Sequence, residues 1–348
     1  MGITAKAYAV MEAKGALVPF FFERRDLRPN DVQFKVSYSG ICHSDIHTVQ
    51  GDWGRVLTPL VPGHEVVGVV TEIGSAVSNF SVGDLIGVGV FVDSCRNCEN
   101  CKRGLQNYCV EGMTGTYNGY ERDGVTQTRG GYSSQFVVDA DYAVHIPENL
   151  PLPGVAPLMC AGITLYSPLR HWNAGPGKKV GVIGLGGLGH MGVKFAVAMG
   201  AEVTVFSHSS NKEEDARRMG AHHFVLTSQP GVFDELKSSF DLILNTVSAD
   251  MDLHPYLRAL KLDGTLVLIG LPGKPYALEG NVLLPARRSI SGSMIGGMPE
   301  LQEMLNFCGE HEITSDVEVI NADYINTAYK RTIASDVKYR FVIDARTL

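Results

Sequence analysis

The sequence has 348 residues, of which 45% are apolar and 19% are charged, a composition typical of a folded globular protein of about two domains. The formal net charge is −7 and no block of basic residues occurs, which argues against nucleic acid or an anionic membrane surface as the main partner. The N-terminus has no apolar core of signal-peptide length and no stretch is long and apolar enough to span a bilayer, so we expect a cytoplasmic protein with reduced thiols.

The first part of the chain, up to about residue 153, is predicted to be rich in β-structure. Val32, Phe34, Val36 and Tyr38 alternate with polar residues, which is the pattern of a half-buried strand. No amphipathic helix of useful length is expected before Pro153. Further strands of this part are predicted at Glu65–Ile73, Leu85–Val92, Gln135–Val138 and Tyr142–Ile146.

One loop of this first part contains four of the seven cysteines of the chain. Cys95, Cys98, Cys101 and Cys109 have the spacing C-x2-C-x2-C-x7-C, which lets a short loop wrap one tetrahedral zinc ion. Disulfides are the alternative, but nothing else in the chain indicates a secreted protein. Iron–sulfur loops also use four cysteines, with different spacings. We therefore predict a structural zinc site.

After Pro153 the period of the apolar residues changes. Pro153–Trp172 is predicted to form a helix or a broken pair of helices, and short apolar runs then alternate with helical segments. This alternation predicts an open parallel sheet with crossover connections. The six predicted strands are Val180–Ile183, Val203–Phe206, Phe224–Leu226, Leu242–Thr246, Leu266–Ile269 and Ile290–Ile295, and the chain ends with predicted helices at Glu300–Glu310 and Ala322–Ile333 and a strand at Arg340–Ile343.

The first of the six strands runs directly into a glycine-rich loop. Residues 180–189 read Val-Gly-Val-Ile-Gly-Leu-Gly-Gly-Leu-Gly, and a helix is predicted at His190–Met199. A G-x-G-x-x-G pattern between a strand and a helix indicates a dinucleotide site, with the diphosphate on the helix N-terminus. A glycine-rich turn without a ligand is the alternative. The loop residues assigned to the cofactor are Gly184, Gly186, Gly187, Leu188 and Gly189.

The end of the second strand indicates which dinucleotide binds. NAD sites place an Asp or Glu there to accept from the ribose hydroxyls, but this chain has Phe206-Ser-His-Ser-Ser-Asn-Lys212 and no carboxylate. The hydroxyls, imidazole and ammonium of this run suit a 2′-phosphate, so we interpret Ser207, His208, Ser209 and Lys212 as NADP(H) contacts. A capping role of Ser209 or Ser210 for a helix at Lys212–Met219 is compatible with that interpretation.

Cys42, His64 and Cys160 lie outside the four-cysteine loop. Two thiols and one imidazole are the ligand set of a zinc site with an open fourth position. Ligands so far apart in sequence cannot be paired by spacing, and each residue alone is more often a buried thiol or a core histidine.

Six segments, in order along the chain, resemble the zinc-dependent medium-chain alcohol dehydrogenases, most closely the cinnamyl alcohol dehydrogenase-like branch. The segments are Gly40–His47, Pro62–Val66, the four-cysteine loop, Cys160–Thr164, Gly184–Gly189 and Ser291–Gly297.

The resemblance implies a fold of the α/β plus β class. It implies a GroES-like β-rich catalytic domain at residues 1–155 and 298–348, and a Rossmann domain with a doubly wound parallel sheet at residues 156–297 that binds NADP. It also implies a homodimer, with Ile290–Ile295 as the edge strand that pairs between subunits.

The resemblance further implies the catalytic metal site. Its zinc ligands would be Cys42, His64 and Cys160, with Glu65 as an alternate ligand, so each chain would bind two Zn2+ ions. Asp45 would accept a hydrogen bond from His64, with capping of a helix as its alternative role.

The reaction expected from the resemblance is hydride transfer between NADP(H) and an aldehyde or alcohol on a zinc Lewis acid. Ser44 would meet the substrate oxygen and His47 would pass the proton to solvent, although a surface imidazole is the alternative for His47. Further cofactor contacts are expected at His43, Thr164, Thr246, Gly270, Ser293 and Ile295. The apolar residues Trp53, Phe91 and Met294 would line the pocket for an aromatic or medium-sized aliphatic aldehyde such as cinnamaldehyde or benzaldehyde.

Three other functions are compatible with parts of this pattern. A polyol dehydrogenase of the same superfamily would bind hydroxylated substrates, whereas the pocket candidates here are apolar. A zinc- and NADPH-binding sensor without turnover would be favoured by the loss of a ligand or relay residue, and none is lost. A zinc-free quinone reductase is disfavoured by the cysteines.

Overall fold

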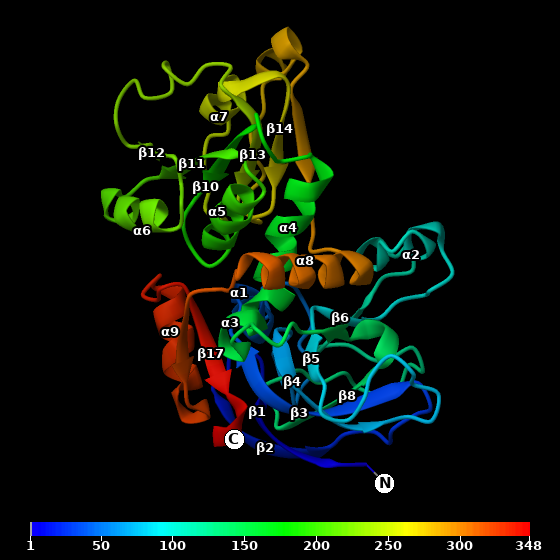
Figure 1. Ribbon diagram of the computed structural model, residues 1–348. Helices are drawn as coiled ribbons and strands as arrows, with labels where there is room; N and C mark the ends of the chain where they lie inside the picture. Colours follow the sequence, from blue (N-terminus) through cyan, green and yellow to red (C-terminus); the bar gives the residue numbers. More distant parts are fainter. Residues whose placement is uncertain (1) are drawn as a thin grey trace. The chain divides into compact units, whose positions relative to one another are not determined.

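The computed structural model describes residues 2–348 (Figure 1). The chain divides into two compact units, the first running to Ile163 and resuming at Gly296, the second spanning Thr164–Ile295. We propose that these units are the two domains; the boundaries expected from the sequence, 155/156 and 297/298, lie near the observed ones. Among the described residues no single helix is long and apolar enough to cross a membrane, although the bent pair Leu152–Met159 and Ala161–His171 meets that test of length and composition together.

A seven-stranded sheet forms the centre of the first unit. Of the four residues predicted to face inward, Val32, Phe34 and Val36 are buried and Tyr38 is half-buried. The sheet is antiparallel apart from the β16–β17 pair, and β8 pairs with β3 beside the main path. The strand order is β16 (Val317–Ile320), β17 (Arg340–Asp344), β3 (Asp31–Gly40), β4 (Val66–Ile73), β5 (Leu85–Val88) and β9 (Val144–His145), with β8 at Gln135–Asp139.

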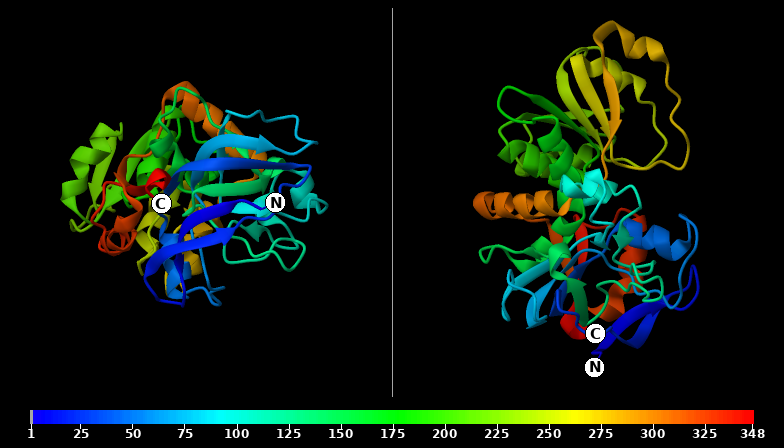
Figure 2. Two further views of the ribbon diagram at one scale, coloured as in Figure 1. Left: turned by 90° about the horizontal axis from the view of Figure 1, so that it is seen from below. Right: turned by 90° about the vertical axis from the view of Figure 1, so that its right-hand side faces the viewer.

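Two small strand pairs and several helices complete this unit. The hairpin of β1 (Thr4–Val10) and β2 (Leu17–Glu23) lies beside the end of the chain, where Lys6 Nζ donates to the Leu348 carbonyl over 3.4 Å (Figure 2). The other elements are β6 (Phe91–Asp93), β7 (Thr114–Gly115), α1 (His43–Gln50), α2 (Glu99–Lys102), α3 (Leu152–Val155), α8 (Met298–His311) and α9 (Ile325–Ile333).

Helix α1 lies in the part of the chain before Pro153, where no amphipathic helix of useful length was expected. It has only eight residues, and its buried side chains include a carboxylate, Asp45, beside Ile46 and Val49. A helix this short, with an acid on its buried face, gives a weak periodic signal, which is why the sequence pattern did not reveal it. The helix ends at Gly51 in the left-handed conformation, with φ of 75°.

The second unit contains the predicted parallel sheet. Its order is β12 (His223–Leu226), β11 (Glu202–Ser207), β10 (Lys179–Ile183), β13 (Phe240–Asn245), β14 (Leu260–Leu268) and β15 (Ser289–Gly292), and every pair is parallel. The chain reverses its direction of travel between β10 and β13, as in doubly wound dinucleotide-binding sheets. Helix α5 (Gly189–Ala198) packs on β10 and β11, α6 (Glu213–Arg218) on β12, and α7 (His254–Ala259) on β14, and α4 (Ala161–His171) leads into the unit.

The edge strand β15 is shorter than expected. The sequence predicted a strand over Ile290–Ile295, but the strand ends at Gly292 and Ile295 has a positive φ of 43°. A positive φ is incompatible with a continued strand, so residues 293–295 leave the sheet.

Candidate active site

The antiparallel pairing of β3 and β4 brings together residues that are far apart in sequence. Ser39, near the end of β3, pairs with Val66 at the start of β4. Cys42 follows β3 and His64 precedes β4, so both lie at the same end of the sheet. Cys160, just before α4, contributes a second thiol at this point.

The donor atoms at this end of the sheet form a buried cluster that suits zinc. The ligand atoms of Cys42, His64, Glu65 and Cys160 all lie within 4.8 Å of one another, and all four residues are buried. The two Sγ atoms are 3.9 Å apart, close to the ~3.8 Å expected for two sulfurs bound at ~2.3 Å to one tetrahedral zinc. His64 Nε2 is buried without a hydrogen-bond partner among the described residues. Since such an atom is costly to leave unsatisfied, its position favours a metal ligand.

The electrostatic surroundings favour a thiolate in this cluster. A hydrogen bond with Cys160, together with the charges of His64 and Arg340, lowers the pKa of Cys42 well below its usual value despite burial. Burial raises the pKa of Glu65 to about 8, and Arg340 opposes that rise. The thiolate is the form of cysteine that binds metal, so the cluster is prepared for a cation.

Asp45, on α1, contacts two residues of the ligand cluster, His64 and Cys42. Its Oδ1 lies 3.1 Å from His64 Nδ1, which orients the ring and leaves Nε2 facing the thiols. Its Oδ2 accepts from the backbone N–H of Cys42 over 3.0 Å and so caps the first turn of the helix. Contact with His64 and capping of the helix were alternatives from the sequence, and Asp45 makes both contacts in the structure.

Arg340 is a charged residue of this site that sequence reasoning did not single out. It begins β17, which pairs with β3 so that Val342 lies opposite Gly40. The guanidinium donates to Glu65 Oε1 and, over 3.0 Å, to the Ile41 carbonyl. An arginine at the start of an apolar strand was the only signal in the sequence, and its acidic partner is 275 positions away.

The residues assigned to proton transfer lie on α1 beside the cluster. Cys42 Sγ and Ser44 Oγ are 3.5 Å apart. His47 Nδ1 lies 2.8 Å from Asp52 Oδ2, and both side chains are open to solvent. His43, at the first position of the helix, is exposed. The half-buried Ser44 and the solvent-open His47 suit a path from the cluster to water.

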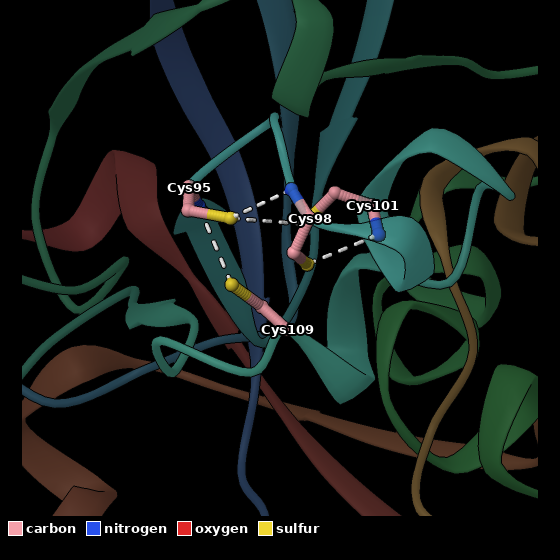
Figure 3. A group of neighbouring side chains, drawn as sticks. All are labelled: Cys95, Cys98, Cys101 and Cys109. Atoms are coloured by element: carbon pink, nitrogen blue, oxygen red, sulfur yellow. Dashed lines mark hydrogen bonds between the residues drawn. The ribbon is translucent and has the colours of Figure 1, made fainter.

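The four cysteines of the 95–109 loop also come together (Figure 3). Cys95 Sγ and Cys101 Sγ are 3.8 Å apart, again the separation expected on a tetrahedral zinc, and no disulfide links the described cysteines. Backbone N–H groups of the loop point at the sulfurs, with Cys98 N donating to Cys95 Sγ over 3.3 Å. Such bonds stabilise negative sulfur, so the loop suits a metal bound by four thiolates.

Apart from Thr164, the cofactor candidates of the second unit lie at or shortly after the carboxyl ends of the parallel strands. The glycine loop follows β10, Ser207 ends β11, Thr246 follows β13, Gly270 follows β14 and Ser293 follows β15. In open parallel sheets, ligands bind at this edge, where the strand order reverses. Thr164, in α4, is buried, and the Thr246 hydroxyl donates to the Ile183 carbonyl over 2.8 Å, which ties the residue after β13 to the end of β10.

The glycine loop has the space that a diphosphate requires. A Cβ on Gly189 would overlap the Gly184 carbonyl oxygen, so the first turn of α5 packs directly on the loop. A Cβ on Gly186 would meet no atom within 4 Å. Gly186 therefore borders open space in front of the helix N-terminus, the position in which a phosphate is bound by N–H groups and the helix dipole.

The segment after β11 presents polar side chains to solvent. His208 and Ser209 are exposed, and Lys212 is half-buried. Ser207 is buried, and its hydroxyl donates to the Ser209 carbonyl and accepts from the Ser209 N–H, so it shapes the turn. Ser209 precedes a short 3-10 turn but makes no side-chain cap, which leaves its hydroxyl available to a ligand.

The pocket candidates have different surroundings. Trp53 is 56% exposed and its ring stacks on His47 at 5.1 Å, whereas Phe91 is buried with its ring edge-on to Tyr142. Met294 is 45% exposed in the second unit, where Ile295 is buried. The side chains of Trp53 and Met294 are therefore accessible to a substrate, whereas that of Phe91 is almost inaccessible.

Comparison with known proteins identifies the two units. Residues 28–148 match the alcohol dehydrogenase GroES-like domain family, and residues 187–310 match the zinc-binding dehydrogenase family. NADP-dependent alcohol dehydrogenase C 1 of Mycolicibacterium smegmatis is 59% identical over 346 residues, and aldehyde reductase YahK of Escherichia coli is 52% identical over 346 residues; each alignment covers 99% of both chains.

The closely similar solved structures include a cinnamyl alcohol dehydrogenase from Sorghum bicolor. It superimposes with a TM-score of 0.95 at 44% identity, covering 99% of this chain and 98% of that chain. The predicted GroES-like and Rossmann folds are confirmed by these matches. With the buried ligand cluster, the four-cysteine loop and the glycine-rich loop after β10 in place, the chain belongs to the zinc-dependent medium-chain alcohol dehydrogenases, in the cinnamyl alcohol dehydrogenase-like branch.

Proposed function

We propose that this protein is an NADP-dependent alcohol dehydrogenase that reversibly reduces aromatic or medium-sized aliphatic aldehydes to primary alcohols. The observation that carries this proposal is the buried cluster of Cys42, His64 and Cys160, in which His64 Nε2 lacks a partner among the described residues. The names of the relatives support the cofactor and the reaction class, since one is an NADP-dependent alcohol dehydrogenase and another an aldehyde reductase.

Each part of the reaction has a candidate residue in this chain. Bound zinc would polarise the substrate oxygen and NADPH would supply the hydride. Cys42, His64 and Cys160 would hold that zinc, with Glu65 as the alternate ligand. Ser44 would hydrogen-bond the substrate oxygen, and His47, held by Asp52 at 2.8 Å, would exchange its proton with solvent.

Two zinc ions per chain and a homodimer belong to the proposal. The second zinc would stabilise the 95–109 loop. The exposed edge of β15 is the proposed site of pairing between subunits, because an unpaired strand edge offers free N–H and C=O groups.

The proposal is tested by following NADPH oxidation with cinnamaldehyde and with benzaldehyde, beside NADH and beside the same protein after zinc chelation. We expect turnover that prefers NADPH and is lost on chelation. Parallel oxidation of mannitol and cinnamyl alcohol addresses the polyol alternative, and we expect cinnamyl alcohol to be the better substrate. Clear NADPH binding without turnover of any aldehyde or alcohol would instead support a non-catalytic sensor.

The cofactor preference has its own test at His208, the exposed residue after β11. Replacing His208 by Asp should raise the KM for NADPH by about tenfold, because the new carboxylate repels the 2′-phosphate. A tenfold change corresponds to about 1.4 kcal/mol, on the order of the energy between two nearby charges in water. The KM for NADH should change little. His223→Asp is the matched control, since it adds the same charge to an exposed histidine at the amino end of β12. An unchanged NADPH KM in His208→Asp would show that this segment does not contact the 2′-phosphate.

A further inference from the structure

Asp45 is completely buried, and four donors converge on its carboxylate. Oδ1 receives the Gly63 N–H over 3.2 Å and lies 3.1 Å from His64 Nδ1. Oδ2 receives the Cys42 N–H over 3.0 Å and the Tyr132 phenol over 3.1 Å. Each carboxylate oxygen thus has two partners, and together they fix the orientation of the carboxylate toward the His64 ring. Of the four donors, only the phenol belongs to a residue outside the two ligand segments.

Tyr132 reaches Asp45 from a loop that is fixed independently. The Tyr132 N–H donates to the Pro62 carbonyl over 3.0 Å, which ties the loop to the segment just before His64. On its other side, the buried Arg24 guanidinium donates to the Gly130 carbonyl and to Ser133 Oγ, each over 2.8 Å. The loop that carries the phenol is therefore fixed on one side by a backbone bond to Pro62 and on the other by the Arg24 side chain.

The Tyr132 phenol remains a neutral donor. Burial raises the pKa of Tyr132 well above its usual value, and Asp45 adds to this effect. Tyr329 of α9 approaches the Tyr132 hydroxyl at 3.4 Å, with the two rings edge to face at 6.5 Å. A contact of 3.4 Å is a weak hydrogen bond, so Tyr329 mainly packs against Tyr132.

We propose that Tyr132 is a positioning residue of the catalytic metal site: its phenol fixes the Asp45 carboxylate, which in turn fixes the His64 ring so that Nε2 faces the two thiols. This inference rests on the proposed zinc-dependent function and adds a residue to its metal site. Without the phenol, the buried Asp45 Oδ2 keeps one donor, the Cys42 N–H, and the carboxylate is held less firmly in its orientation toward His64. Partners of this kind typically contribute about 10–100-fold to metal affinity or activity.

The test uses the zinc-loaded protein and the variants Tyr132→Phe and Tyr329→Phe. Zinc release to a colorimetric chelator is followed with time, and the thermal unfolding midpoint is recorded for each protein. The four-cysteine site serves as an internal reference, because it shares none of these hydrogen bonds. Tyr329→Phe is the matched control, since it removes a buried phenol one step further from the carboxylate.

We expect Tyr132→Phe to release one of two zinc ions about 10–100-fold faster, with the second zinc unaffected. Tyr329→Phe should release both ions at rates close to the unmodified protein. Unchanged release in Tyr132→Phe would overturn the inference, as would faster release of both ions with a matching fall in the unfolding midpoint, which indicates general loosening. If the unmodified protein itself held only the slowly released zinc, the proposed function would fail and this inference with it.

Discussion

Replacing Cys42 by Ser is expected to abolish aldehyde reduction while leaving the protein folded. Replacing Cys101 by Ser is expected instead to destabilise the folded protein. Cys42 supplies one of only three strong ligands of the proposed catalytic zinc. The loss of a Lewis acid removes several kcal/mol of transition-state stabilisation, so kcat/KM should fall by at least ~10³-fold. The unfolding midpoint should fall no further than for other buried Cys→Ser exchanges. The strands that flank Cys42 are held by backbone hydrogen bonds, such as that from the Ile41 N–H to the Phe341 carbonyl over 2.9 Å.

Cys101 has a different position in the molecule. It is buried in a loop whose only regular elements are short, and its Sγ lies 3.2 Å from Ser94 Oγ. The free energy of zinc binding to such a loop is largely free energy of folding. Cys101→Ser should therefore lose one zinc and lower the thermal unfolding midpoint strongly.

Zinc content, kcat/KM and thermal unfolding of both variants are measured together, with Cys308→Ser as the control. Cys308 is completely buried in α8 and belongs to neither ligand cluster. It reports the cost of exchanging any buried thiol for a hydroxyl, which is about 1–3 kcal/mol. If Cys42→Ser lost stability to the same extent as Cys101→Ser, the division into a catalytic and a structural site would be wrong.

Sequence reasoning succeeded where the signal is local. The four cysteines lie within fifteen positions, so their spacing alone predicts that they meet, and their ligand atoms do lie together. The glycine loop is likewise a contiguous strand, turn and helix, and it follows β10 as expected. The six parallel strands were predicted from short apolar runs, with errors at the start of β14, which begins six residues earlier at Leu260, and at the end of β15, where the positive φ of Ile295 breaks the pattern.

Sequence reasoning failed where the partner of a residue is distant. Tyr132 and Asp45 are 87 positions apart, and neither residue type at its position indicates the other. Cys42 and Cys160, 118 positions apart, were brought together only through the family resemblance. Besides its short length, helix α1 was hard to predict because its cap is made by Cys42 and Asp45, residues whose side chains are also directed at the ligand cluster. The chemistry of the site thus displaced the usual capping residues that mark a helix in sequence.

Removing the Arg340 guanidinium is expected to produce a large loss of stability in the first unit. Arg340 and Glu65 are both buried, and the guanidinium bonds the carboxylate and the Ile41 carbonyl. Breaking one partner of a buried ion pair costs about 3–5 kcal/mol, because the other charge stays buried without compensation. We therefore expect Arg340→Met to lower the free energy of unfolding in urea by about that amount at pH 9, where Glu65, with a pKa raised to about 8, is mostly ionised in the unmodified protein.

Arg346→Met is the matched control for this measurement. Arg346 lies six positions further along the same end of the chain and pairs with Asp344, but its side chain is 62% exposed. An exposed pair contributes about 0–1 kcal/mol, so this variant should be nearly as stable as the unmodified protein. Equal losses in the two variants would show that burial does not make the Arg340–Glu65 pair special.

The double variant Arg340→Met with Glu65→Gln separates charge from packing. If the loss in Arg340→Met arises from an uncompensated carboxylate, making residue 65 neutral should restore part of the stability. If the double variant is no more stable than Arg340→Met alone, the contribution of Arg340 lies in its bond to the Ile41 carbonyl and in its packing. In that case Arg340 acts mainly by holding the end of β3 in position, and with it Cys42, and its charge matters little to the fold.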